Sequence, residues 1–208
     1  MTEFFYRTED IKPDEVMEYL VETKRDREII TALKARNPVI LAGSRGVGKS
    51  FLLRIAESEL RRDFDTERVL PVYVSFSRSS LINTNDPQQF QHWMLARICA
   101  RLTRTLHKAG LVAGIAHGLS TLTGQSAVPS PDRPTPIEEL VTLFEQSWNG
   151  PVANIDTSVL PSLDSFRDAV EDVCVALELE RIVVLIDEAA HILLPEQQRQ
   201  FFTLFRDL

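Results

Sequence analysis

The residues that could do chemistry begin with Gly43-Ser44-Arg45-Gly46-Val47-Gly48-Lys49-Ser50, which matches the phosphate-binding pattern G-x-x-x-x-G-K-[ST] at every fixed position. Glycines let backbone N–H groups approach a phosphate closely, and a helix that starts at the end of the loop adds its positive dipole end. We expect Lys49 to reach the β- and γ-phosphates of a nucleotide and the Ser50 hydroxyl to ligate Mg²⁺. The residues expected to bind the nucleotide are Gly43, Ser44, Arg45, Gly46, Val47, Gly48, Lys49, Ser50 and Phe51.

A second candidate lies far downstream, where a β-branched apolar run over 181–186 ends in Asp187 and Glu188. An uninterrupted apolar run is typical of a strand that is buried on both faces in a parallel sheet. Ligands of such sheets bind beyond the carboxyl ends of the strands, so both signals point to one sheet edge. The alternative is an ordinary strand that ends in two solvated carboxylates. The segment resembles the Walker B element of P-loop ATPases, which implies that Asp187 helps to hold Mg²⁺ and that Glu188 is the general base.

Strand and helix signals surround the loop in the order that a phosphate site needs. Residues 38–42 are apolar and predict a buried strand, whereas 51–60 have the spacing of an amphipathic helix. Residues 69–76 predict a second strand with Pro71 near its start, where proline is tolerated. Residues 13–36 predict helices that Asn37-Pro38 terminates.

A long helix is predicted from Asp86-Pro87, with a capping residue followed by proline at the first helical position. This helix has an apolar stripe and a basic stripe. The basic stripe is either a solvated face or a contact for phosphates or an acidic partner. The apolar stripe comprises Phe90, Met94, Ile98, Leu102 and Leu106, and the basic stripe comprises Arg97, Arg101, Arg104 and Lys108.

Three further helices are predicted in the second half. A capping box at Thr135–Glu138 starts a helix that runs to about Trp148, where Asn149-Gly150-Pro151 ends it. Asp164 or Ser165 is expected to cap the next helix, and Pro195 to begin the last one. The stretch 109–134 is rich in small residues and then in proline, which predicts a loop-rich segment with a short helix.

Composition favours a soluble globular protein of one domain, with 208 residues, 44% hydrophobic and 25% charged residues. The net charge of −7 gives no reason to expect whole-chain attraction to nucleic acid. Cys99 and Cys174 have no metal-ligand spacing, and no secretory signal or membrane-spanning apolar stretch is visible, so we expect a cytoplasmic protein without membrane contact.

The order of elements is similar to that of AAA+ ATPases, in particular origin-recognition and initiator-type ATPases, and STAND-type signalling ATPases share much of it. The resemblance is carried by the Arg27-Glu28 helix, GSRGVGKS, the strand VLPVYVSF, the Asp86 helix, the helix around Phe166, and VVLIDEAAH. It implies an α/β P-loop NTPase fold, a three-layer α/β/α arrangement with a parallel sheet, over 1–208.

Two departures from that family pattern qualify the expectation. The separation of Lys49 from Asp187 is long, which predicts an insertion over about 107–160. No sensor strand, helical lid or arginine finger can be found after the Walker B-like segment, so the fold is expected to be incomplete at the C-terminus. In the resembling fold the sensor strand lies between the loop strand and the Walker B strand. The chain is then a fragment, or the missing strand comes from another polypeptide, or the topology differs, and of these we expect a fragment.

Two functions follow from these observations. The first is a Mg²⁺-dependent ATPase core that binds ATP or ADP, acts in a homo-oligomer or on an effector protein, and engages nucleic acid through a downstream region. The alternative is a regulatory, STAND-like signalling module that hydrolyses slowly. A GTPase is disfavoured because no Asn-Lys-x-Asp motif is present. A nucleotide kinase and a HerA-like or FtsK-like translocase remain open.

Overall fold

The computed structural model describes residues 15–44, 46–78, 82, 88–125, 133–147, 155–189 and 194–207. The chain divides into two compact units, one made of Met1–Tyr73 and Glu180–Asp187, the other of Val74–Leu179 and Glu188–Leu208. The predicted helix start at Asp86-Pro87 and the predicted helix end from Trp148 to Pro151 lie outside the described residues.

The first unit carries the phosphate-loop sequence and combines helices with a small sheet. Thr23 caps the helix α1 through a complete capping box with Asp26, and that helix ends at Lys34, before Asn37-Pro38 as predicted. Its elements are the short helix η2 (Val16–Tyr19), α1 (Lys24–Lys34), α2 (Lys49–Arg62), α3 (Phe64–Glu67), β1 (Val69–Ser75, whose last two residues belong to the second unit) and β2 (Arg181–Asp187).

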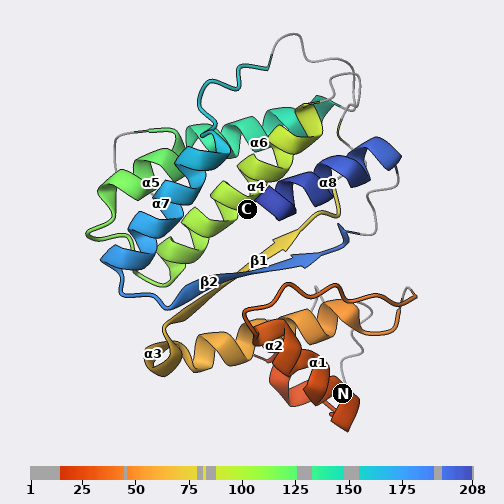
Figure 1. Cartoon of the computed structure of the whole chain (residues 1–208). Coiled ribbons are helices and arrows are strands. Elements are labelled where there is room, and N and C mark those ends of the chain that lie inside the picture. The colour runs from red at the N-terminus through yellow and green to blue at the C-terminus, as the bar shows by residue number, and fades with distance from the viewer. Residues whose placement is uncertain are drawn as a thin grey trace. The chain divides into compact units, whose positions relative to one another are not determined.

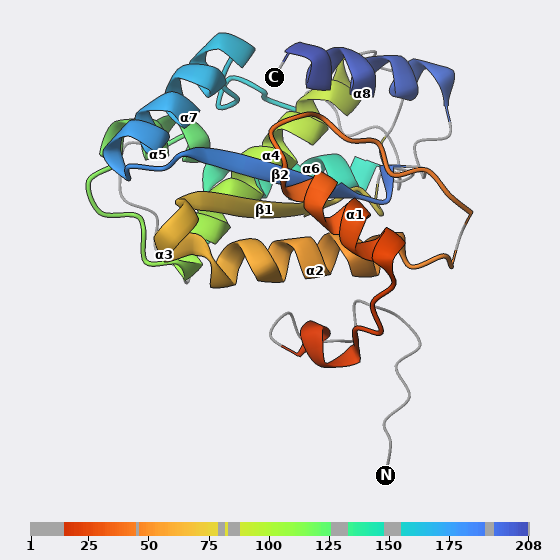
Figure 2. The same cartoon turned by 60° about the horizontal axis from the view of Figure 1, so that its bottom comes forward.

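The sheet of the described residues has two strands, β1 and β2, which are hydrogen-bonded neighbours. Both arrows point the same way in Figure 1, and the strands remain side by side in Figure 2, so the pair is parallel. The strands predicted at 69–76 and at 181–186 are therefore confirmed, and the fold is mixed α/β. β1 is buried nearly throughout, but Val184 of β2 is 39% exposed, so the prediction of a strand buried on both faces is wrong for β2.

The strand predicted at 38–42 does not form. The segment has no regular secondary structure, and its apolar side chains Val39 and Ile40 are 43% and 81% exposed. A strand needs a neighbour for its backbone N–H and C=O groups, and the two-stranded sheet of the described residues does not include this segment. The prediction failed because it was based on the apolar run alone, and the segment has no neighbouring strand among the described residues.

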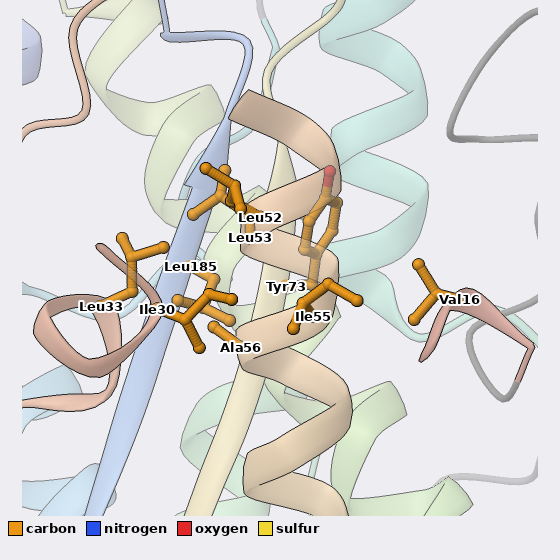
Figure 3. Close-up of a cluster of buried hydrophobic side chains, with 9 residues drawn as sticks. All are labelled: Val16, Ile30, Leu33, Leu52, Leu53, Ile55, Ala56, Tyr73 and Leu185. Carbon is orange, nitrogen blue, oxygen red and sulfur yellow. The ribbon is translucent and has the colours of Figure 1, made fainter. Parts of the chain in front are cut away.

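An apolar cluster holds the first unit together. The short helix η2, helices α1 and α2, and both strands contribute to it, as Figure 3 shows. Burial of α2 follows the amphipathic spacing predicted for 51–60, so this helix is confirmed. The buried members are Val16, Ile30, Leu33, Leu52, Leu53, Ile55, Ala56, Tyr73 and Leu185.

The second unit is mainly helical. The helices α4 and α6 contact each other, and α5 lies beside α7 (Figure 1), where Gly118 permits a close approach because a Cβ there would lie 2.8 Å from the Ala169 carbonyl oxygen. Its helices are α4 (Gln89–Lys108), α5 (Ala116–Thr123), α6 (Pro136–Gln146), α7 (Leu163–Ala176) and α8 (Pro195–Asp207).

Most predicted features of these helices are confirmed, and one is corrected. The Thr135–Glu138 capping box is complete, α8 begins at Pro195, and the predicted apolar stripe of α4 is buried. The cap of α7, however, is Ser162 instead of Asp164 or Ser165, because the Ser162 side chain accepts the Ser165 backbone N–H. Among the described residues, no helix is both long and apolar enough to span a membrane.

Candidate functional site

The loop before α2 depends on its glycines. Gly46 and Gly48 both have φ of +85°, a region that residues with a Cβ rarely adopt, and Gly48 is the residue that leads into α2. A Cβ on Gly43 would lie 3.0 Å from a methyl carbon of Val47. A side chain at Gly46 or Gly48 would therefore strain the loop, and one at Gly43 would require Val47 to move. Arg45 lies outside the described residues.

Lys49 lies at the first position of α2 and folds back over the loop. Its Nζ donates hydrogen bonds to the carbonyl oxygens of Gly43, at 2.8 Å, and Ser44, at 2.7 Å. The ammonium is thus held beside the loop backbone by two neutral acceptors. Phosphate oxygens are stronger acceptors for a cation than carbonyl oxygens, so an entering phosphate could take these hydrogen bonds over.

Ser50 and Asp187 meet although 137 positions separate them in the chain. The Ser50 hydroxyl at the start of α2 donates to Oδ1 of Asp187, at the end of β2, over 3.0 Å. Asp187 is 7% exposed. The structure therefore brings together the two residues that the sequence marks as Mg²⁺ ligands.

Tyr73 contributes to this arrangement and was not found from the sequence. Its hydroxyl donates to Oδ2 of Asp187, and the guanidinium of Arg54 lies 3.4 Å from the centre of its ring. Burial raises the pKa of the Tyr73 hydroxyl, and the hydrogen bond to Asp187 raises it further. Tyr73 is therefore a neutral donor. The signal that could have found it is a polar group near the carboxyl end of β1, the strand beside β2.

Arg54 is itself anchored on α2. Its Nη1 donates to Glu57 over 2.9 Å, and Arg61 donates to the other oxygen of the same carboxylate over 2.6 Å. Glu57 is only 2% exposed, and a buried carboxylate requires a counter-charge. Two arginines of its own helix, Arg54 and Arg61, supply that charge. The cation above the Tyr73 ring is thereby fixed to the helix that carries Lys49 and Ser50.

Glu188 belongs to the second unit and is held differently. The Ser75 hydroxyl donates to its Oε2 over 2.8 Å, and its backbone has φ of +59°, which is uncommon for a residue with a long side chain. Ser75 is in turn held by Arg97 of α4, whose Nε donates to the Ser75 carbonyl oxygen over 3.0 Å. Arg68 and Glu178 share this backbone conformation next to helix ends, whereas Glu188 directly follows β2.

The donor set of Ser50 and Asp187 fits Mg²⁺, which prefers oxygen ligands and takes the remainder from water and substrate phosphates. Among the residues that the structure describes, no group of three or more His, Cys, Asp or Glu side chains is placed to hold a metal ion. A divalent cation held by Ser50 and Asp187 would take its remaining oxygen ligands from water or from a bound phosphate. The oxygen atoms of Ser50 and Asp187 are of the type that Mg²⁺ prefers, so these two residues could hold the cation that the sequence predicts.

These features define an α/β protein with a glycine loop, a following helix and an acidic residue at the end of a parallel strand. The chain belongs to the ORC-CDC6-like family, whose pattern it matches over residues 4–207. The predicted resemblance to origin-recognition and initiator-type ATPases is thereby confirmed, and membership implies the P-loop fold and nucleotide binding of AAA+ ATPases. No curated protein and no solved structure matched the chain.

Proposed function

We propose that this chain is the Mg²⁺-dependent ATPase core of an AAA+ switch or motor that works in an oligomer. The observation that carries the proposal is the 3.0 Å contact between Ser50 and Asp187, which joins the end of the glycine loop to the end of β2. A chance glycine-rich turn would have no reason to place its serine against a buried carboxylate. Family membership supports the same assignment, including the three-layer α/β/α arrangement around the sheet.

In the proposed reaction the residues of the loop bind and orient the triphosphate. Backbone N–H groups at the N-terminus of α2 would bind the phosphates, and Lys49 would exchange the loop carbonyl oxygens of Gly43 and Ser44 for phosphate oxygens. Mg²⁺, when bound, neutralises charge that develops on the transferred phosphoryl group. Ser50 and Asp187 would hold that ion.

Glu188 is proposed as the general base, which orients the attacking water and accepts its proton. A second copy of the chain or an effector protein would complete the site, and binding of ATP or ADP would control that association. Action on nucleic acid, through a region other than this site, is a further part of the proposal.

The test is Lys49→Ala in the full chain, measured as the affinity for a fluorescent ATP analogue. We expect binding to weaken at least about tenfold, because charge-assisted hydrogen bonds to phosphate are the strong ones. Lys108→Ala, which removes an exposed lysine at the end of α4, is the matched control and should bind normally. Equal affinity of Lys49→Ala and wild type would refute the proposal.

A further inference from the structure

Tyr73 has a hydroxyl that packing does not require. Its ring lies in the apolar cluster beside Ile55, with the oxygen pointing away from that residue (Figure 3), and the whole residue is only 7% exposed. A phenylalanine would fill the same space. A buried phenol needs a hydrogen-bond acceptor, and this one uses Oδ2 of Asp187.

The Asp187 carboxylate is held by donors from two different elements. Ser50 on α2 donates to Oδ1, and Tyr73 on β1 donates to Oδ2. Donors on both oxygens restrict rotation of the carboxylate, which matters for a group that must face a cation. Ser50 is itself an expected cation ligand. Tyr73 is not, so its hydrogen bond serves only to orient the Asp187 carboxylate.

The orientation of Tyr73 is set by α2. Arg54 lies over the ring face, and its ion pair with the buried Glu57 keeps it there. A cation over an aromatic face is attracted by the ring and polarises the phenol toward stronger donation. The helix that carries the phosphate loop therefore also fixes the group that orients Asp187.

We propose that Tyr73 is a positioning residue for Asp187, and that its hydroxyl sets how strongly Mg²⁺ binding strengthens nucleotide binding. This inference rests on the proposed function, because it assigns Tyr73 to the same Mg²⁺–nucleotide site. Tyr73 itself touches neither the cation nor the phosphates in this assignment. Its effect passes through the Asp187 carboxylate.

The test compares Tyr73→Phe with wild type as full chains. The affinity for a fluorescent ATP analogue is measured in EDTA and in excess Mg²⁺. The affinity in Mg²⁺ divided by the affinity in EDTA is the ratio that measures how strongly Mg²⁺ strengthens nucleotide binding. Loss of a group that orients a metal ligand typically lowers metal affinity 10- to 100-fold, so we expect the ratio to fall about tenfold. Affinity in EDTA should stay within about twofold of wild type, because the phosphate contacts are untouched.

Tyr19→Phe is the matched control, since Tyr19 lies in the same unit but is 45% exposed and outside the Asp187 contacts described above. In an Asp187→Asn background, Tyr73→Phe should cause no further fall in the ratio, as expected of two residues that act through one interaction. An additional, independent fall there would overturn the proposal.

The possible outcomes separate this inference from the proposed function. A wild-type chain that binds no nucleotide in either condition refutes the ATPase proposal and this inference with it. Mg²⁺-strengthened binding in wild type, with an unchanged or larger ratio in Tyr73→Phe, refutes the role of Tyr73 alone. If Tyr73→Phe weakens nucleotide binding equally in EDTA and in Mg²⁺, the role proposed for Tyr73 is also refuted, because the residue then supports the structure of the site and not the binding of Mg²⁺.

If circular dichroism shows that Tyr73→Phe is unfolded, Arg54→Gln carries the test. This change removes the cation over the ring but keeps the hydroxyl, and Arg61 still pairs with Glu57. We expect the ratio to fall about two- to fivefold, since the cation acts on the hydroxyl indirectly. An unchanged ratio in a folded Arg54→Gln chain would overturn the proposal.

Discussion

Asp187 and Glu188 are consecutive, yet their side chains accept hydrogen bonds from different groups. Asp187 takes its donors from Ser50 and Tyr73, whereas Glu188 takes one from Ser75. In the proposed function Asp187 holds the cation whereas Glu188 accepts a proton from water, so the two carboxylates have different roles. Replacing each acid separately should therefore affect different steps.

Replacement of Glu188 by glutamine should separate nucleotide binding from hydrolysis. The amide keeps the size of the side chain but cannot accept a proton, so we expect ATP turnover to fall at least 100-fold, within the usual contribution of a general base. ATP affinity should stay within about threefold of wild type, since Lys49 and Ser50 are unchanged. Turnover is followed as phosphate release.

A slow signalling module would give a different result in the same assay. Wild-type turnover would already be very low, and Glu188→Gln would change it little. Such a result would favour the regulatory alternative over the motor or switch that hydrolyses ATP.

The residues of the candidate site could be predicted from sequence only where a fixed spacing marks them. Lys49 and Ser50 belong to a contiguous pattern, and Asp187 follows an apolar run. Tyr73 and Arg54 carry no such pattern, because the contacts that give them a role are made by elements distant in sequence or by packing on α2. The place of Tyr73 near the carboxyl end of a predicted strand is a weak signal, and the hydrogen bond to Asp187 is visible only in the structure.

At the scale of elements, α4 and α6 are joined by a buried carboxylate. Glu145 of α6 is 7% exposed and accepts from Arg97 of α4 over 2.8 Å and from Arg78 over 2.6 Å. Burial lowers the pKa of Arg97, and the charge of Glu145 opposes that effect. The predicted basic stripe of α4 is therefore partly used inside the unit, where Arg104 also pairs with Glu138 of α6.

Glu145→Gln should destabilise the second unit. The change leaves the Arg97 cation buried without its counter-charge, and breaking a buried pair from one side costs about 3–5 kcal/mol. Arg167→Ala is the control, because its pair with Asp164 is exposed and should contribute less than about 0.5 kcal/mol. Urea unfolding followed by circular dichroism measures both. Equal stability of Glu145→Gln and wild type would contradict the role given to this ion pair.

The contact between α1 and α2 should make the first unit sensitive to acid. Burial alone would raise the pKa of Glu59, but hydrogen bonds from Arg27 and Lys34 outweigh it, so the pKa lies below its usual 4.5. A depressed pKa in the folded state means that the unfolded chain binds the proton more readily. The stabilisation is therefore complete above about pH 5 and is lost as pH falls through the folded-state pKa.

Glu59→Gln should consequently be less stable than wild type by about 1–3 kcal/mol at pH 7, since hydrogen bonds to a charged group are lost. The difference should shrink as the pH is lowered from 5 to 3, measured by urea unfolding at each pH. Glu28→Gln is the control at an exposed position of α1. A difference that is constant over this range would show that the ionisation of Glu59 does not matter.

Elements that depend on local sequence were predictable, and those that depend on a distant partner were not. The apolar stripe of α4 and the Thr135 capping box are properties of neighbouring residues. The segment 38–42 has an equally clear apolar pattern but forms no strand, because a strand also requires a neighbour. The cap of α7 was missed by a few residues because several serines and an aspartate compete for that position.

At the scale of the whole molecule, charge limits what the chain can bind by itself. It has 23 basic and 30 acidic residues, a net charge of −7, and two of the α4 arginines, Arg97 and Arg104, are occupied by α6 carboxylates. Non-specific binding to duplex DNA depends on free cations that neutralise phosphates. We therefore expect the net charge to disfavour non-specific binding of duplex DNA by these 208 residues.

A fluorescence anisotropy titration with a labelled DNA duplex in about 150 mM salt checks this statement. We expect a Kd weaker than about 10⁻⁴ M, the weak end of non-specific binding. A basic DNA-binding domain under the same conditions serves as the positive control. Micromolar binding with a steep dependence on salt would contradict the expectation and reveal a local basic surface that composition hides.

The left-handed backbone at Glu188 means that stability and chemistry favour different residues at one position. Glycine would adopt φ of +59° without the cost that a Cβ brings, about 1 kcal/mol. A search for stabilising substitutions would therefore be drawn to this position and would remove the very carboxylate that we assign to catalysis. Thermostability and turnover should consequently be selected together if this protein is ever engineered.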